Sequence, residues 1–209
     1  QAMTTGQFAA MNSDQIGALT TLEITKLESQ DLRAISTAAL RALNSDQLAA
    51  LTSDQVPTLT TQQVAALTSD QIAGLGSADL NALTTAQFAS LSSAQVAAMN
   101  TDQIGALVSD DLRAISTAGL RAWSTDQLNA LSSANMGALT TAQTAALTTD
   151  QIRNLSSTDL NALGTAQFAA LTTAQVGAFS SDQVAALATD DLQAMTTGQF
   201  AAMNSDQIG

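Results

Sequence analysis

The amino-acid sequence predicts an all-α solenoid of very short helices, about six residues each, with one helix in every eight-residue repeat. Three observations predict this fold. The eight-residue frame has no insertion or deletion, each repeat contains a helix-start pattern, and the apolar spacing fits neither one long helix nor a strand. The chain is therefore interpreted as a single continuous array, residues 1–209, of 26 octads.

A large apolar residue at every eighth position, from Met3 to Met203, defines the repeat. This position is called a, and positions b to h follow it. Position f is also apolar, except for Thr144, and position c is always Ser or Thr. Position e is Gln in 17 octads and Asp in five, and position h is mostly Ala. The consensus is Leu-Thr-Ser/Thr-Asp/Ala-Gln-Ile/Leu/Val-Ala-Ala.

One continuous helix is not expected, because eight residues advance an α-helix by two turns plus roughly 80°. The a positions would then spiral around the helix and never form one buried stripe. A strand is not expected either, since apolar spacings of five and three are not an alternation.

Each octad instead matches the start of a helix. With the N-cap at b, position e becomes N3, and pairs such as Thr52 and Gln55 form a capping box. Positions a and f, such as Leu51 and Val56, then form a hydrophobic staple. A frame with the cap at c, one residue later, fits almost as well, and the sequence leaves both open.

The charges agree with this placement. Of the 18 acidic residues, 17 lie at d or e, in the first helical turn, and five of the six basic residues lie at g, near the helix end. Helices of this length do not persist alone. Positions a, f and h are therefore expected to stack against neighbouring octads, with Ala at h allowing close approach.

Longer spacings bear on the number of octads per coil. Residues 31–47 resemble residues 111–127, 80 positions later, and residues 193–209 repeat residues 1–17 without change, at a spacing of 192. Both spacings are multiples of sixteen, which favours two octads per coil; three octads per coil suits 192 but not 80. The array begins inside an octad, so we expect it to be an excerpt of a longer one.

Three places are expected to depart from the regular octad. Pro57 at position g removes a helical N–H, so its octad should be the least regular. The octads beginning Leu107-Val108 and Leu187-Ala188 lack a capping residue at b and should start loosely. Trp123 stands where Leu43 stands 80 residues earlier, and we expect local repacking or partial exposure.

Composition excludes several classes of function. The chain has no His and no Cys, so the usual general base and thiolate metal sites are missing, and we expect no enzyme activity and no cofactor. Its net charge of −12 disfavours binding to nucleic acid. The longest apolar runs are too short for membrane insertion, and we find no signal peptide in this sequence.

Few residues are candidates for a binding site. The adjacent carboxylates Asp110, Asp111, Asp190 and Asp191 are weak Ca²⁺ candidates, because hard cations prefer several oxygen ligands. First-turn residues of capped helices are the favoured interpretation of these pairs. The row of hydroxyls at c could face an ordered lattice such as ice or a glycan, but helix capping together with bonds between coils explains it better. The arginines at g are expected to be solvated, with bridges to carboxylates as the alternative. The methionines at a are interpreted as core residues rather than haem ligands.

The repeated Leu-Thr-Thr-Asp/Ala-Gln-Ile/Val-Ala-Ala octad resembles the low-complexity tracts of very large bacterial surface and secreted proteins, labelled adhesins or haem-utilisation proteins. The resemblance covers the whole chain and implies an extracellular stalk, fibre or adhesin. Haem binding is not expected, because no His or Tyr is present as an axial ligand. The first hypothesis is a structural filament or stalk that associates with copies of itself. The alternative is a repetitive surface of Ser/Thr and Asp rows that binds Ca²⁺ or a patterned partner.

Overall fold

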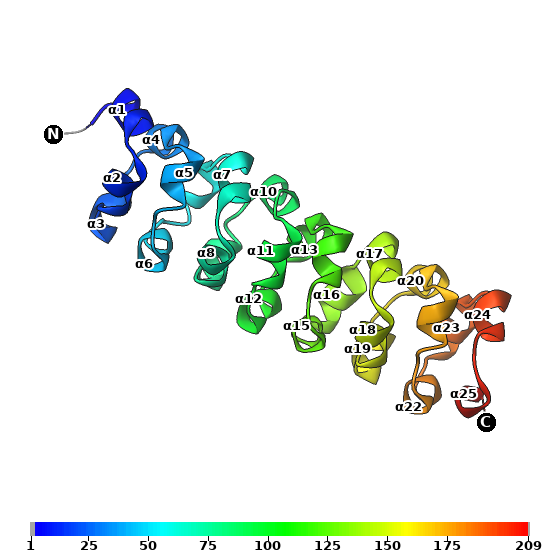
Figure 1. Ribbon diagram of the computed structural model, residues 1–209. Coiled ribbons are helices and arrows are strands. Elements are labelled where there is room, and N and C mark those ends of the chain that lie inside the picture. The colour runs from blue at the N-terminus through cyan, green and yellow to red at the C-terminus, as the bar shows by residue number, and fades with distance from the viewer. Residues whose placement is uncertain (1–2, 209) are drawn as a thin grey trace.

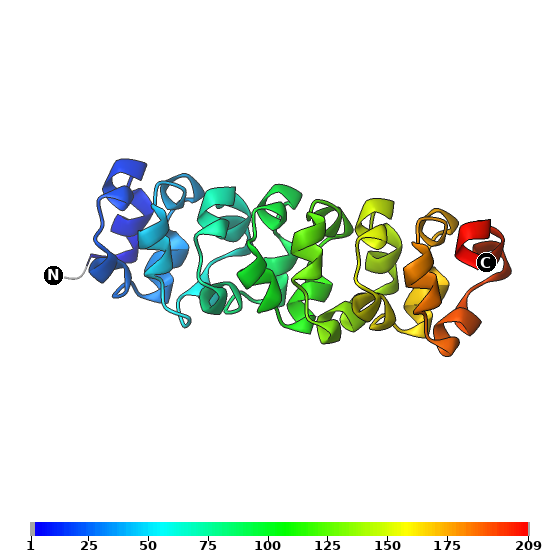
Figure 2. The same cartoon turned by 90° about the horizontal axis from the view of Figure 1, so that it is seen from below.

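The computed structural model describes residues 3–208, which form an elongated rod with its two ends far apart (Figures 1 and 2). Within these residues every regular element is helical: the α-helices have four to six residues, and one 3-10 helix has three. The predicted all-α solenoid with one short helix per octad is confirmed, and many helices are shorter than the expected six residues.

Every α-helix begins at position c of its octad, while the 3-10 helix η1 begins at position f. The first coils contain α1 (Thr5–Ala10), α2 (Ser13–Gly17), α3 (Thr21–Ile24), α4 (Ser29–Ala34), α5 (Thr37–Leu40), α6 (Ser45–Ala49), η1 (Val56–Thr58), α7 (Thr61–Ala66) and α8 (Ser69–Ala73). The central part contains α9 (Ser77–Leu80), α10 (Thr85–Ala89), α11 (Ser93–Ala97), α12 (Thr101–Gly105), α13 (Ser109–Ala114), α14 (Thr117–Arg121), α15 (Thr125–Asn129), α16 (Ser133–Ala138) and α17 (Thr141–Ala146). The last part contains α18 (Thr149–Arg153), α19 (Ser157–Asn161), α20 (Thr165–Ala170), α21 (Thr173–Val176), α22 (Ser181–Ala185), α23 (Thr189–Ala194), α24 (Thr197–Ala201) and α25 (Ser205–Ile208).

The N-cap of each helix lies at position b, which decides between the two frames left open by the sequence. In α7, Thr60 has extended backbone angles, φ −74° and ψ 154°, and its hydroxyl accepts from the Gln63 N–H at 3.1 Å. Gln63 Oε1 in turn accepts from the Thr60 N–H at 2.8 Å. This reciprocal pair is the predicted capping box, and it recurs along the chain.

The helices end without any glycine turn. Leu67, at position a after α7, is extended with φ −58° and ψ 148°, and its N–H bonds to the Val64 carbonyl at 3.2 Å. Two consecutive extended residues, a and b, therefore separate one helix from the next. No residue of the described range has a positive φ, so the chain turns without the left-handed glycine that commonly ends a helix.

The helices stack three octads apart, so the prediction of two octads per coil is wrong. Helix α13 packs on α10, and α14 packs on α11. The polar contacts between coils join residues 25 to 31 positions apart, which is more than the 24 residues of three octads. Helices α1, α10 and α20 lie along the same edge of the rod (Figure 1). Each is ten octads from the next. Between α1 and α10 the helix numbers differ by only nine, because η1 occupies one of the octads. The 80-residue spacing, which is ten octads, therefore returns each feature to the same edge of the rod.

The core follows the rod axis and consists of positions a and f. At f, Ile104 and Leu112 are fully buried, and Leu107 at a is nearly so. These side chains form one continuous apolar cluster along the described chain. Because each helix is only about one turn long, burial between coils, rather than helix length, stabilises it.

The predicted irregularities have mixed outcomes. The octad of Pro57 forms η1 instead of an α-helix, as predicted. Val108 and Ala188 provide no capping hydrogen bond, yet α13 and α23 still begin at c and reach six residues. The prediction that these two helices start loosely is wrong, because packing on neighbouring coils compensates for the missing cap.

Close approach between coils pairs position g of one coil with an alanine at position h of the next, and it leads to a prediction. A Cβ at Gly137 would lie 2.7 Å from the Ala162 carbonyl oxygen of the next coil. Gly137→Ala is therefore expected to lower the free energy of unfolding by about 1–3 kcal/mol through overpacking. Gly198→Ala meets only its own cap at 4.0 Å, and it should leave stability unchanged or raise it by up to about 1 kcal/mol. Urea unfolding of both variants tests this, and equal effects would contradict it.

Candidate functional site

The most regular polar feature of the rod is the buried glutamine at position e. Gln95 is buried; its Nε2 donates to the carbonyls of Val64 and Leu67 in the preceding coil, each at 2.9 Å. Its Oε1 accepts from the Ser92 N–H of its own helix at 2.8 Å. We call this arrangement, one side chain joining its own N-cap to two carbonyls of the preceding coil, a glutamine bridge.

The glutamine bridge recurs at every position-e Gln from residue 47 to residue 207. Gln7 and Gln15, which have no preceding coil in the described chain, keep only the capping box. The bridging glutamines are Gln47, Gln55, Gln63, Gln71, Gln87, Gln95, Gln103, Gln127, Gln143, Gln151, Gln167, Gln175, Gln183, Gln199 and Gln207. Sequence reasoning assigned the cap but missed the bridge. The missed signal was the amide nitrogen, which a capping box leaves unused.

Trp123 is accommodated by repacking, one of the two outcomes predicted for it. Its side chain is buried, and its indole Nε1 donates to the Val96 carbonyl at 2.9 Å. A Cβ at Gly119 would lie 3.2 Å from the Val96 side chain. The glycine thus leaves room beside the same valine that the tryptophan contacts.

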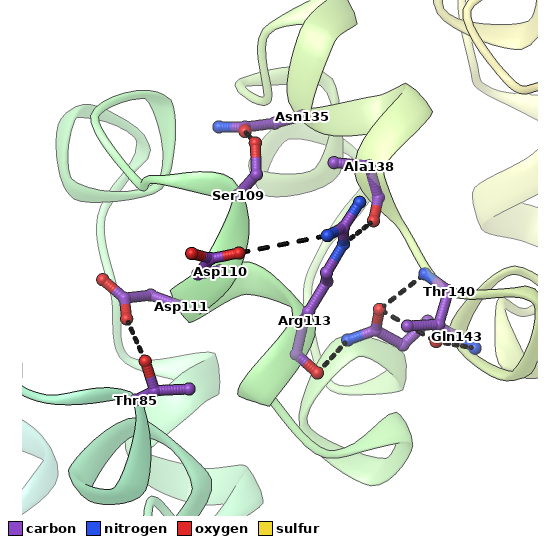
Figure 3. A network of polar contacts seen from close by, with 9 residues as sticks. All are labelled: Thr85, Ser109, Asp110, Asp111, Arg113, Asn135, Ala138, Thr140 and Gln143. Carbon is purple, nitrogen blue, oxygen red and sulfur yellow. Dashed lines mark hydrogen bonds and ion pairs between the residues drawn. The ribbon is translucent and has the colours of Figure 1, made fainter.

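The adjacent aspartates do not converge on one point. Asp111 is buried, and its carboxylate accepts from the Thr85 hydroxyl at 3.4 Å, in the preceding coil (Figure 3). Asp110 is exposed and lies 3.9 Å from Arg113 of its own helix. Likewise, Asp190 is exposed and Asp191 is buried. Residues 3–208 contain no group of three or more carboxylates that could hold a metal ion together.

Burial changes the titration of these carboxyl groups. Burial raises the pKa of Asp111, the neighbouring Asp110 charge adds to the rise, and the Thr85 hydrogen bond opposes it. Burial, and then the Asp190 charge, likewise raises the pKa of Asp191. The exposed Glu23 behaves oppositely, because hydrogen bonds from the Thr20 N–H and hydroxyl lower its pKa.

Eight exposed acidic residues lie on helices that follow one edge of the rod. Helices α3, α6, α8, α12, α15, α18, α22 and α25 lie along the edge opposite α1, α10 and α20 (Figure 1). Each carries an exposed acidic side chain in its first turn: Glu23, Asp46, Asp70, Asp102, Asp126, Asp150, Asp182 and Asp206. We call this row the acidic edge.

The arginines at g and the hydroxyls at c also contribute bonds between coils. Arg113 Nε donates to the Ala138 carbonyl at 2.9 Å (Figure 3), so it is not merely solvated as expected. Ser69 at c donates to the Ala94 carbonyl at 3.3 Å. The c hydroxyls do not cap the helices, since b does, and some of them connect neighbouring coils as predicted.

Comparison with known proteins gives one family. The family model of the ALTTAQ repeat matches most of the chain, at residues 24–61, 72–109, 106–141, 131–157, 152–189 and 184–209. No curated protein matches the sequence significantly. In the described chain, no helix is long and apolar enough to cross a membrane.

Proposed function

Because the chain belongs to the ALTTAQ repeat family, we propose that it is a structural protein whose stacked octads form a segment of a filament, stalk or fibre. The glutamine bridge is the observation that carries this proposal. It satisfies equivalent backbone groups in one coil after another, so further coils can be added to the stack through the same hydrogen bonds. The proposed role is mechanical, with no catalysis and no cofactor.

Self-association is the second part of the proposal, and the coils at the two ends support it. Phe8 and Phe200 occupy identical segments, yet Phe8 is 7% exposed under the next coil and Phe200 is 42% exposed. A further coil stacked on α24 and α25, from this chain or a second copy, would bury Phe200 and Ile208. A contact of this kind does not close on itself, so it generates a fibre.

The proposed location is the bacterial cell surface or the extracellular space. The resemblance of the octads to tracts of bacterial surface and secreted proteins supports it. Immunogold labelling of intact cells of the source organism tests this location. Labelling only after permeabilisation would overturn it.

Electron microscopy of the purified chain tests self-association. We expect filaments or lateral bundles whose length increases with protein concentration. Phe200→Asp, which places a charge on the exposed end, should shorten the filaments, whereas Asp110→Asn on the side of the rod should not. Monodisperse short rods at all concentrations would overturn the proposal.

The acidic edge favours a second candidate function, a repetitive surface that binds Ca²⁺ or a patterned partner. One carboxylate per coil gives a regularly repeated row of negative charges, and Ca²⁺ can bridge such a carboxylate to oxygen ligands of a partner surface. Calorimetric titration with Ca²⁺ tests it. Saturable heat that disappears on joint replacement of Asp102, Asp126 and Asp150 by Asn would support this function, and no saturable heat would exclude it for Ca²⁺.

A further inference from the structure

Five octads place an aspartate where the bridging glutamine stands elsewhere, and three of them, each ten octads apart, bury it: Asp31, Asp111 and Asp191. Their side chains are 7%, 5% and 6% exposed. Helices α4, α13 and α23, which carry them, pack on α1, α10 and α20. Each of those three helices contains a phenylalanine at f: Phe8, Phe88 and Phe168. The 80-residue spacing therefore repeats a buried carboxyl stacked on an apolar helix, always on the same side of the rod.

Asn135 also lies at position e, and its side chain is as long as that of an aspartate. It therefore shows which groups of the preceding coil such a side chain contacts. Its Oδ1 accepts from the Ser109 hydroxyl, 26 residues earlier, at 2.8 Å. Its Nδ2 donates to the Leu107 carbonyl, 28 residues earlier, at 2.6 Å. One amide thus bonds to the preceding coil through both of its polar atoms.

Asp111 makes the first of these two bonds but not the second. Its Oδ1 accepts from Thr85, again 26 residues earlier. The residue 28 positions earlier is Leu83, and within residues 3–208 its carbonyl accepts no hydrogen bond. An ionised carboxylate cannot donate to a carbonyl, so Asp111 can supply this bond only when it carries a proton. Asp31 repeats the pattern, with Thr5 donating to its Oδ1 at 2.7 Å.

We propose that Asp111, and Asp191 at the equivalent buried position, are proton-dependent joints between coils. A proton taken from solvent onto the free carboxylate oxygen lets the side chain donate to the carbonyl 28 residues earlier, as Asn135 does. Loss of that proton leaves the carbonyl without this donor, which weakens the joint. The rod is then held more tightly in acid than at neutral pH.

No neighbouring charge compensates for the buried carboxylate. The two helices packed on α13, namely α10 and α16, contain no charged or titratable side chain. On α13 itself the charged residues are Asp110, whose charge opposes ionisation of Asp111, and Arg113, which lies near Asp110. Helix α20 beside Asp191 is also without charge. Asp31 differs, because Glu23, Lys26 and Glu28 line the same cavity as its side chain, and the proposal therefore does not include it.

The direction of the pH effect follows from linkage. A carboxyl group whose pKa is raised in the folded chain binds its proton more tightly there than in the unfolded chain. Its stabilisation is complete below the unfolded value, near 3.8 for Asp, and is lost as the pH rises through the folded pKa. Thermal stability should therefore increase as the pH falls from neutral towards about 4.

Thermal unfolding of Asp111→Asn, at neutral pH and near pH 4, tests the joint. Asn supplies the missing donor at any pH, so the Tm at neutral pH should rise by about 2–4 °C. The gain in Tm on acidification should be smaller than in the unchanged chain. Asp110→Asn is the matched control, because it removes the same charge from an exposed neighbour. It should leave the gain on acidification largely intact.

Two results would overturn the proposal. The first is an Asp111→Asn variant with no gain in Tm at neutral pH, or with the full pH dependence of the unchanged chain. The second comes from the chain without substitution, where carboxyl resonances are followed by NMR during an acid titration. The Asp111 carboxyl is expected to titrate above the ordinary Asp value of 3.8, and a midpoint at or below that value would exclude the joint.

Discussion

Phe88→Ala is expected to lower the free energy of unfolding by about 3–5 kcal/mol. Phe88 is at position f of α10, is fully buried and is one of the largest side chains of the axial core. Removing the ring leaves a cavity between coils that a one-turn helix has little means of filling. Because each coil contacts only its neighbours, the cavity also weakens the connection between the two halves of the rod.

Phe200→Ala is the matched control for this prediction. The two phenylalanines occupy the same octad position, but Phe200 is 42% exposed. Its replacement should cost well under half as much as that of Phe88. Urea unfolding followed by circular dichroism and by the fluorescence of Trp123, the single tryptophan, measures both the whole rod and its centre. Equal costs for the two variants would contradict burial between coils as the main source of stability.

Gln95→Ala is expected to lower the free energy of unfolding by about 2–4 kcal/mol, since it leaves two buried carbonyls and one N–H of the helix start without their partner. These groups are the Ser92 N–H and the carbonyls of Val64 and Leu67. The loss should be larger than that of an ordinary helix cap, because most of it arises between coils.

Ser92→Ala separates the contribution of the helix cap from that of the bonds between coils. It removes the cap bond to the Gln95 N–H, at 3.3 Å, and leaves the glutamine bridge in place. The expected cost is about 1 kcal/mol, as for other N-cap residues. Gln95→Glu adds a further comparison, because the carboxylate can accept from the Ser92 N–H but cannot donate to the carbonyls. If Gln95→Ala costs no more than Ser92→Ala, the glutamine bridge does not hold the coils together.

The candidate surfaces were predictable only in part. The sequence indicated acidic first turns, but it did not indicate that eight of them form the acidic edge, because that depends on how the coils are wound. The pair Asp110 and Asp111 was noticed as adjacent carboxylates. The structure shows that one faces solvent and the other the neighbouring coil. Adjacent helical residues point in directions about 100° apart, so neighbours in sequence need not share an environment.

The capping box, to within one residue of its position, and the irregular octad of Pro57 follow from the sequence alone, because capping bonds act over a few residues. Thr60 and Gln63 illustrate this, since each satisfies the other's backbone within one turn. The number of octads per coil was decided by tertiary structure. It depends on bonds such as that from Gln95 to Val64, 31 residues away, and no local preference of an octad determines which earlier carbonyl a side chain reaches.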